Sequence, residues 1–181
     1  MIKIELAFPD MHKMLEAHRQ EIDLFIAAIM QTNRGLLFDT EGKHNGRPGW
    51  APLKYRSGQI LSKRGTLRKS MAPYEAKGTA GPDGVVRVSG DTITIGTTLF
   101  YAKMMNHGTT GLPGGVLRPK TKKALKIPTG NGGFVLRTVV LIPARHFDDW
   151  TSDDQQEMEE ALSNKIVQVL EREIKAGGRN V

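Results

Sequence analysis

Helical periodicity at the two ends of the chain, separated by a long glycine- and proline-rich interior, is the feature that most constrains the fold. Near the C-terminus, Ser152 followed by Gln155 forms a capping-box pattern, and apolar residues then recur at helical spacing as far as Gly177. Carboxylates crowd the first turns, where the helix dipole favours them, and Lys175 lies in the last turn. The pattern predicts an amphipathic helix over residues 152–177.

A second apolar stripe predicts a helix from Met11 to Met30, with Asp10 as its N-cap and Gly35 beyond its end. Before it, residues 2–6 alternate between apolar and charged side chains, which predicts a short strand. This opening segment is not typical of a signal peptide. The chain also has no run of roughly 18 apolar residues, so we expect no membrane partner.

Two long irregular regions lie between the terminal helices. Residues 39–58 have no sustained periodicity and many turn-forming residues, which predicts an extended arm. The apolar residues Trp50, Pro52 and Leu53 indicate that this arm docks on another surface. Residues 106–133 contain seven glycines and three prolines, which predicts a second, basic loop without a long regular element.

The remaining predicted elements are short. A helix is expected over residues 59–71, with a break at Gly65, and β-rich runs on either side of a polar turn predict a hairpin over 85–96. Residues 101–105 form either a helical turn or the end of the sheet, and residues 134–142 form a strand. The sequence therefore predicts a single α+β domain spanning 1–181. In it, a small antiparallel sheet packs with an N-terminal and a C-terminal helix, and two long loops extend from it.

Charge is unevenly distributed along the chain. The net charge is +7, yet no Asp or Glu occurs between Asp91 and Asp148, and the segment after Asp148 is acidic. A basic surface favours nucleic acid or an acidic protein as partner. The basic loop 118–126 can neutralise phosphates without reading bases, although a solvated loop explains its charge equally well. Its basic residues are Arg118, Lys120, Lys122, Lys123 and Lys126.

No catalytic constellation is recognisable in the sequence. The absence of cysteine excludes disulfides, thiolate metal sites and cysteine nucleophiles. The five histidines show no metal-ligand spacing, and the helix dipole explains the acidic run 148–154 without an ion. The glycine-rich stretch 130–133 precedes a predicted strand, so it lacks the helix N-terminus of a phosphate-binding loop. We therefore expect no enzymatic activity, no cofactor and no bound metal.

Several short stretches occur in a characteristic order along the chain. They are Trp50–Leu53 (WAPL), Gly65–Met71 (GTLRKSM), Ile95–Thr97 followed by Tyr101–Ala102, His107–Gly108, and Ile142–Arg145 (IPAR). In this order and approximate spacing they resemble the phage virion morphogenesis family, the tail-completion proteins of tailed bacteriophages. The resemblance does not extend to the segment between His107 and Pro143, so it assigns no role to the basic loop.

The resemblance implies a structural protein of the virion, a tail-completion or head–tail connector subunit of the neck that works in a ring, with six subunits expected. Its implied partners are further copies of itself, neighbouring connector proteins, and tail-tube or terminator proteins. Assembly would take place in the host cytoplasm. In a ring around the DNA passage, the five basic residues of 118–126 would face double-stranded genomic DNA. Trp50, Pro52 and Leu53 would dock between subunits.

Two other classes of protein are alternatives to this hypothesis. A non-sequence-specific nucleic-acid-binding protein of the cell accounts for the charge equally well. It does not account for the arm containing Trp50 or for the acid-rich amphipathic helix. A small hydrolase would need a nucleophile–base pair that the sequence does not offer.

Overall fold

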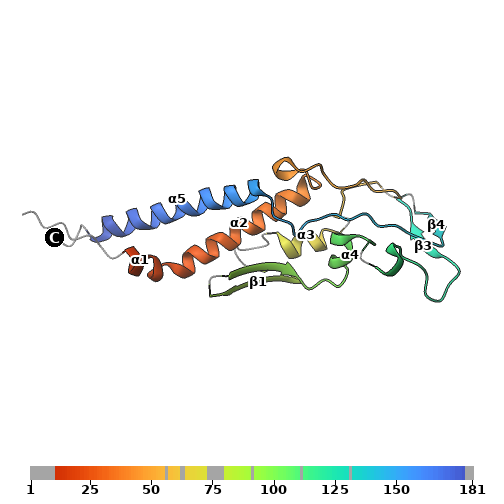
Figure 1. The fold of residues 1–181 in the computed structure, drawn as a ribbon, viewed down its shortest axis with the longest axis horizontal. Helices are drawn as coiled ribbons and strands as arrows, with labels where there is room; N and C mark the ends of the chain where they lie inside the picture. The colour runs from red at the N-terminus through yellow and green to blue at the C-terminus, as the bar shows by residue number, and fades with distance from the viewer. Residues whose placement is uncertain are drawn as a thin grey trace, which may run out of the picture.

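The structure, a computed structural model, describes residues 11–55, 57–61, 64–72, 80–90, 92–110, 112–130 and 132–177 (Figure 1). The molecule is elongated, with long helices at one end and a small β-hairpin at the other. The strand predicted over 2–6 and the predicted N-cap Asp10 lie outside the described residues. Among the residues that are described, no helix is both long enough and apolar enough to cross a lipid bilayer.

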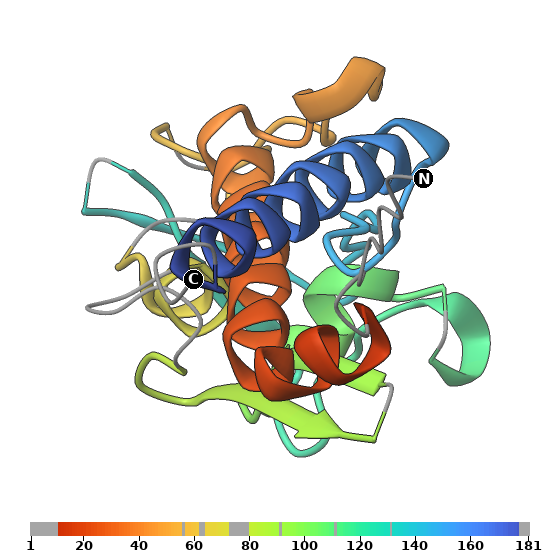
Figure 2. The ribbon, with the colours of Figure 1, turned by 90° about the vertical axis from the view of Figure 1, so that its left-hand side faces the viewer.

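Three helices form the helical end: α1 (Met11–Ala17), α2 (Arg19–Asp39) and α5 (Ser152–Gly177). Helix α5 runs antiparallel to α2, because contacts near the start of α2 involve the end of α5 and the reverse, and α1 also contacts α5. Helix α2 lies between α5 on one side and the first hairpin on the other (Figure 2). The predicted C-terminal helix is thus confirmed, whereas the single N-terminal helix predicted from Met11 is present as two helices, α1 and α2, that meet at His18.

Helix α2 extends further than its apolar stripe predicted. It continues through Gly35, which is buried, and ends at Asp39. Leu37 and Phe38 in this extension are fully buried in the hydrophobic core. Burying these two side chains outweighs the weak helix propensity of one glycine, roughly 1 kcal/mol. The predicted helix end near Met30 is therefore wrong because tertiary packing decides it.

The capping of α5 also differs from the prediction. The backbone N–H of Asp154 donates to the Thr151 hydroxyl (3.2 Å), and the backbone N–H of Thr151 donates to the Asp154 carboxylate (3.1 Å). This is a reciprocal capping box with Thr151, not Ser152, as the N-cap. The predicted N-cap is wrong by one residue, and the observed capping box assigns a capping role to the Asp154 side chain.

Two separate two-stranded antiparallel sheets are present among the described residues. Strands β1 (Gly84–Ser89) and β2 (Thr92–Thr97) form the predicted hairpin, with Val86 opposite Ile95. Strands β3 (Leu125–Pro128) and β4 (Phe134–Arg137) form a second hairpin, with Ile127 opposite Val135. The α+β class is confirmed, with two small sheets in place of the single one expected.

The second hairpin corrects two predictions. The strand expected over 134–142 ends at Arg137, and only an isolated bridge pairs Leu117 with Val140. Strand β3 lies inside the region expected to be a loop throughout. Four residues beside prolines and glycines carry too little periodicity to indicate a strand, so β3 is set by its pairing with β4.

The other regular elements are single turns or short helices. Helix α3 (Thr66–Met71) follows Gly65, whose φ of 68° is left-handed, so the helix expected over 59–71 begins only at Thr66. Residues 101–105 were expected to form either a helical turn or the end of the sheet, and helix α4 (Ala102–His107) shows that they are helical. The 3-10 turns η1 (His44–Gly46) and η2 (Pro113–Gly115) lie within the two regions that were expected to be irregular.

Candidate functional site

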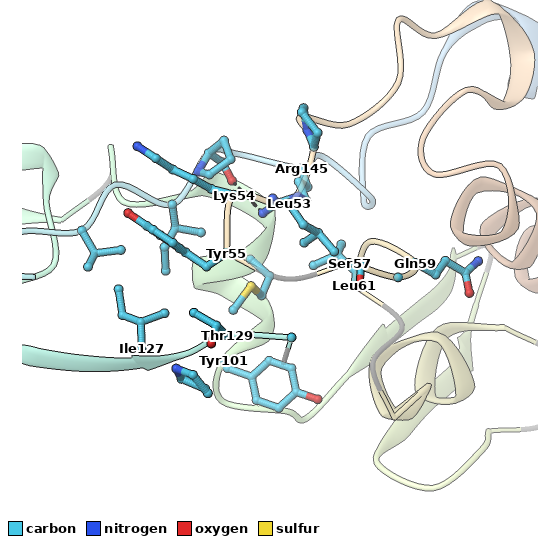
Figure 3. Close-up of a pocket in the computed structure, with 18 of the residues that line it drawn as sticks. Leu53, Lys54, Tyr55, Ser57, Gln59, Leu61, Tyr101, Ile127, Thr129 and Arg145 are labelled. Atoms are coloured by element: carbon cyan, nitrogen blue, oxygen red, sulfur yellow. Dashed lines mark hydrogen bonds between the residues drawn. The ribbon is translucent and has the colours of Figure 1, made fainter. Parts of the chain in front are cut away.

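An open groove of about 1100 Å³ lies between the arm and the second hairpin (Figure 3). Leu53 comes from the arm, Leu61 from the segment after it, Tyr101 from the position before α4, Met105 from α4 and Ile127 from β3. Most of these side chains are apolar. The groove therefore offers hydrophobic contact to a partner rather than a set of reactive groups.

Asn106 holds the segment that closes the groove. Its side-chain oxygen accepts from the backbone N–H of Phe147 (2.8 Å), and its amide donates to the Asp148 carboxylate (2.6 Å). Its backbone carbonyl accepts from the N–H of Arg145 (2.9 Å). Asn106 and its hydrogen bond to Phe147 are buried, so this hydrogen bond is protected from water. The 145–148 segment is consequently fixed against α4.

Arg145 and Gly108 explain two of the stretches on which the family resemblance rests. Buried Arg145 donates to the carbonyl of Ala51 (3.2 Å), which ties the arm to the end of the IPAR stretch. A Cβ at Gly108 would lie 2.5 Å from the carbonyl oxygen of Ile142 and 2.6 Å from the N of Ala144. The His107–Gly108 and Ile142–Arg145 stretches therefore lie in contact, and both have structural roles.

A buried ionic centre joins the arm, α2 and α5, and the sequence analysis missed it. Fully buried Asp154 accepts hydrogen bonds from Arg34 (3.2 Å), Arg47, Asn33 (3.1 Å) and Asn45 (2.7 Å). Burial by itself would raise the pKa of Asp154, but the hydrogen bonds from Arg47 and the other donors outweigh it and hold the pKa well below its usual value. The helix dipole is therefore an incomplete explanation of the acidic run.

Arg34 is the second buried charge of this centre. It donates to the backbone carbonyls of Phe147 and Asp149 (both 2.8 Å) and lies 3.8 Å from the ring centroid of Trp150. Burial lowers the pKa of Arg34 to about 10, opposed by the nearby Asp154 carboxylate. Apart from a hydrogen bond to the Asn33 side chain (3.0 Å), these contacts link it to the 147–154 segment, so the centre is a structural clamp that no local sequence pattern could indicate.

A second ionic network fastens α5 to the start of α2. The Glu21 carboxylate accepts from Lys165 (2.6 Å) and Arg172 (2.7 Å), and His18 lies 3.0 Å from the Glu173 carboxylate. The Arg172 and Lys165 hydrogen bonds lower the pKa of Glu21 to about 2. His18 is half-buried at the interface between α2 and α5.

The predicted DNA-facing residues all lie exposed at the hairpin end of the molecule (Figure 1). They are Arg118, Lys120, Lys122, Lys123 and Lys126. Lys103 and Arg137 are also exposed, which makes seven exposed cations in a stretch without any carboxylate. None of the seven forms an ion pair with a residue in the described part of the chain.

The three predicted docking residues have different environments. Trp50 packs edge-on against Phe38, with ring centroids 5.3 Å apart, at the border of the core. Leu53 is half-buried in the groove, and Pro52 is exposed at its rim. Trp50 therefore has a partner within its own chain, and the prediction of docking between subunits now concerns Pro52 and Leu53.

His146, Asp148 and Asp149 form one group of potential metal ligands within the described ranges, with ligand atoms within 4.8 Å of one another. All three are exposed, and Asp148 already accepts from Asn106 while Asp149 lies 3.5 Å from His146. The spacing of the histidines in the sequence did not predict this group. Exposed carboxylates with protein partners give no reason to assign an ion here.

Comparison of the chain with protein-family models, curated proteins and solved structures finds no match. The chemistry of the site consists of an apolar groove, a surface of unpaired cations and two structural ionic clusters. This combination suits binding to another macromolecule through shape and charge.

Proposed function

We propose that this protein is a structural subunit of a bacteriophage virion, a tail-completion or head–tail joining protein that works as part of a ring in the neck. The separation of charge on its surface carries the proposal. Six exposed cations between Arg118 and Arg137, together with Lys103 on α4, lack carboxylate partners among the described residues, whereas α5 has five exposed carboxylates and only two exposed basic side chains. Opposite charges that cannot pair within one chain are available to pair between chains.

The shape of the chain supports the same role. A ring requires two different faces of each subunit to meet, and an elongated subunit with distinct ends offers such faces. The contact of Gly108 with the 142–144 backbone adds support, because it joins two of the stretches that resemble the phage family. The role is architectural, and the proposal needs no reactive group.

In the proposed assembly the ring surrounds the path of double-stranded DNA. Arg118, Lys120 and Lys122 are exposed and unpaired, so they can attract phosphates without reading bases. Lys123 and Lys126 complete this basic set. Further copies of the chain, connector proteins, and tail-tube or terminator proteins are the proposed neighbours. The chain would assemble in the host cytoplasm and remain in the virion neck.

The proposal is tested with the phage that encodes the chain. Deletion of the gene is expected to leave heads and tails that do not join, and the wild-type chain supplied from a plasmid is expected to restore joined particles. Electron microscopy of the restored particles should place the chain as a ring, expected to be hexameric, in the neck. Complete and infectious particles from the deletion strain would refute the proposal.

A non-sequence-specific nucleic-acid-binding protein is the second candidate, favoured by the same seven unpaired cations. This function predicts that the isolated monomer binds a labelled duplex in a fluorescence anisotropy titration. The logarithm of the binding constant should fall with the logarithm of salt concentration, with a slope of about −0.9 for each phosphate neutralised. Such binding by a chain that never assembles would favour this candidate over the ring subunit.

A further inference from the structure

The β3–β4 hairpin has two different faces. Because residues directly opposite each other in an antiparallel pair share a face, Ile127 and Val135 lie on one side, whereas Lys126 and Leu136 lie on the other. Ile127 and Val135 are half-buried. The opposite side, here called the hairpin face, is exposed and consists of Lys126, Pro128, Phe134 and Leu136.

The hairpin face is apolar and uncovered. Phe134 and Leu136 are 53% and 56% exposed, and the Lys126 ammonium lies 3.9 Å from the ring centroid of Phe134. A two-stranded sheet with one open apolar face has little stability of its own. Neighbouring large apolar side chains in water commonly mark a contact with another molecule. The hairpin face therefore has the properties of an interface with a cationic centre.

Helix α5 carries a surface of complementary chemistry along its outer side. Positions three, four and seven residues apart share one side of a helix, and such a series is exposed here. This helix stripe consists of Asp153, Gln156, Glu160, Ser163, Val167, Glu171 and Ile174. Val167 and Ile174 are 52% and 60% exposed. The stripe thus has carboxylates at Asp153, Glu160 and Glu171 and uncovered apolar side chains at Val167 and Ile174.

We propose that the hairpin face of one copy packs on the helix stripe of the next copy in the assembly. The inference rests on the proposed function, because it names the surfaces through which ring subunits would meet. Lys126 would lie beside Glu160, and Leu136 with Phe134 would pack on Val167.

The hairpin face is long enough to lie over both Glu160 and Val167, with Lys126 and Leu136 opposite each other at the same position along the strands. Glu160 and Val167 are about 10 Å apart along the helix axis, at a rise of about 1.5 Å per residue. A strand of four residues spans about 13 Å. One hairpin can therefore contact the charged and the apolar part of the stripe together.

The two surfaces cannot meet within one chain. Helix α5 runs from the middle of the molecule toward one end, and the hairpin lies at the other end (Figure 1). Contact between two different faces of identical chains is heterologous, and it produces a ring when the rotation between copies closes. Nucleic acid is a poorer occupant of the hairpin face, since phosphates would pair with Lys126 but leave Phe134 and Leu136 uncovered.

The sharpest test uses two variants that each block one surface. Leu136→Asp places a carboxylate on the hairpin face, and Val167→Asp places one on the helix stripe. We expect wild-type protein to self-associate in sedimentation velocity, and each variant alone to lose at least about tenfold in association affinity. An equimolar mixture should form a 1:1 dimer and nothing larger, since only one intact pair of surfaces remains. Circular dichroism should show that both variants are folded like wild type.

A charge exchange tests the polar half of the contact. Lys126→Glu or Glu160→Lys alone should weaken association about twofold to fivefold, as for an exposed ion pair, and the two changes in one chain should restore it. The matched controls are Lys103→Glu and Glu16→Lys, which make the same charge changes at exposed positions outside both surfaces. The controls should associate like wild type.

The outcomes separate this inference from the proposed function. Assembly of Leu136→Asp or Val167→Asp at wild-type affinity, or a mixture that yields no dimer, would overturn the inference while leaving the ring subunit standing. A Lys126→Glu chain that loses only affinity for duplex DNA would also overturn it. Wild-type protein that stays monomeric up to on the order of 1 mM would overturn it as well. The gene-deletion phage decides the proposed function independently.

Discussion

Replacement of Asp154 by asparagine would measure how much the buried ionic centre stabilises the fold. Asp154 and Arg34 have side chains 0% and 1% exposed, so loss of the carboxylate leaves the Arg34 guanidinium charged and cut off from water. Removing one partner of a buried pair costs about 3–5 kcal/mol. Arg47 is 11% exposed and can turn partly toward solvent, which favours the lower part of that range.

A loss of about 3 kcal/mol is a large share of the roughly 5–15 kcal/mol by which a domain is stable. Urea unfolding followed by tryptophan fluorescence is a suitable assay, because Trp150 lies 3.8 Å from the Arg34 guanidinium and reports on the centre itself. With a denaturant dependence of about 2 kcal/mol per molar urea, the midpoint should fall by about 1.5 M.

Asp153→Asn is the matched control for this measurement. Asp153 is the preceding residue of α5, carries the same charge and is exposed, so its free energy of unfolding should change by less than about 0.5 kcal/mol. If Asp154→Asn also changed stability by less than about 1 kcal/mol, the clamp interpretation of the centre would be refuted. The loss should be present across pH 5–8, where a carboxyl group with a lowered pKa is ionised in both the folded and unfolded chain.

Two further predictions address the loop contacts and the helix network. Gly108→Ala should destabilise the protein by about 1–3 kcal/mol in thermal unfolding, because the new Cβ would lie 2.5 Å from a backbone carbonyl. Gly114→Ala, also at positive φ but with nothing within 4 Å, should cost less, and equal losses would contradict the packing explanation. Arg172→Gln should raise the pKa of Glu21 from about 2 toward 4.5 in an NMR titration. Since folding lowers the pKa of Glu21, the wild-type network stabilises the protein above about pH 4.5, and this stabilisation is lost as the pH falls toward 2. An unchanged pKa of Glu21 in Arg172→Gln would exclude Arg172 as the cause of the shift.

Elements whose residues carry a strong local pattern were predictable from the sequence. The periodicity of α5 and its end at Gly177 match the prediction, and so does the β1–β2 hairpin on either side of Gly90. In both cases neighbouring residues along the chain supply the contacts. The exposure of the basic residues also followed from their type, because an unpaired lysine or arginine side chain is costly to bury.

Elements that depend on distant residues were not predictable in this way. The continuation of α2 through Gly35 depends on the core around Phe38, and β3 depends on its pairing with β4. The ionic centre depends on Arg34, Arg47 and Asp154, which are far apart in the sequence. No window of the sequence contains these contacts, so no periodicity could indicate them.

The sequence by itself therefore determined the class of the fold, the terminal helices, the first hairpin and the uneven charge of the chain. Tertiary structure alone decided the groove, the uncovered hairpin face and the burial of Asp154 among its donors. The physical reason is the range of the interactions. Helix periodicity, capping and turn geometry act over a few residues, whereas burial and charge pairing depend on which distant segments meet in the folded molecule.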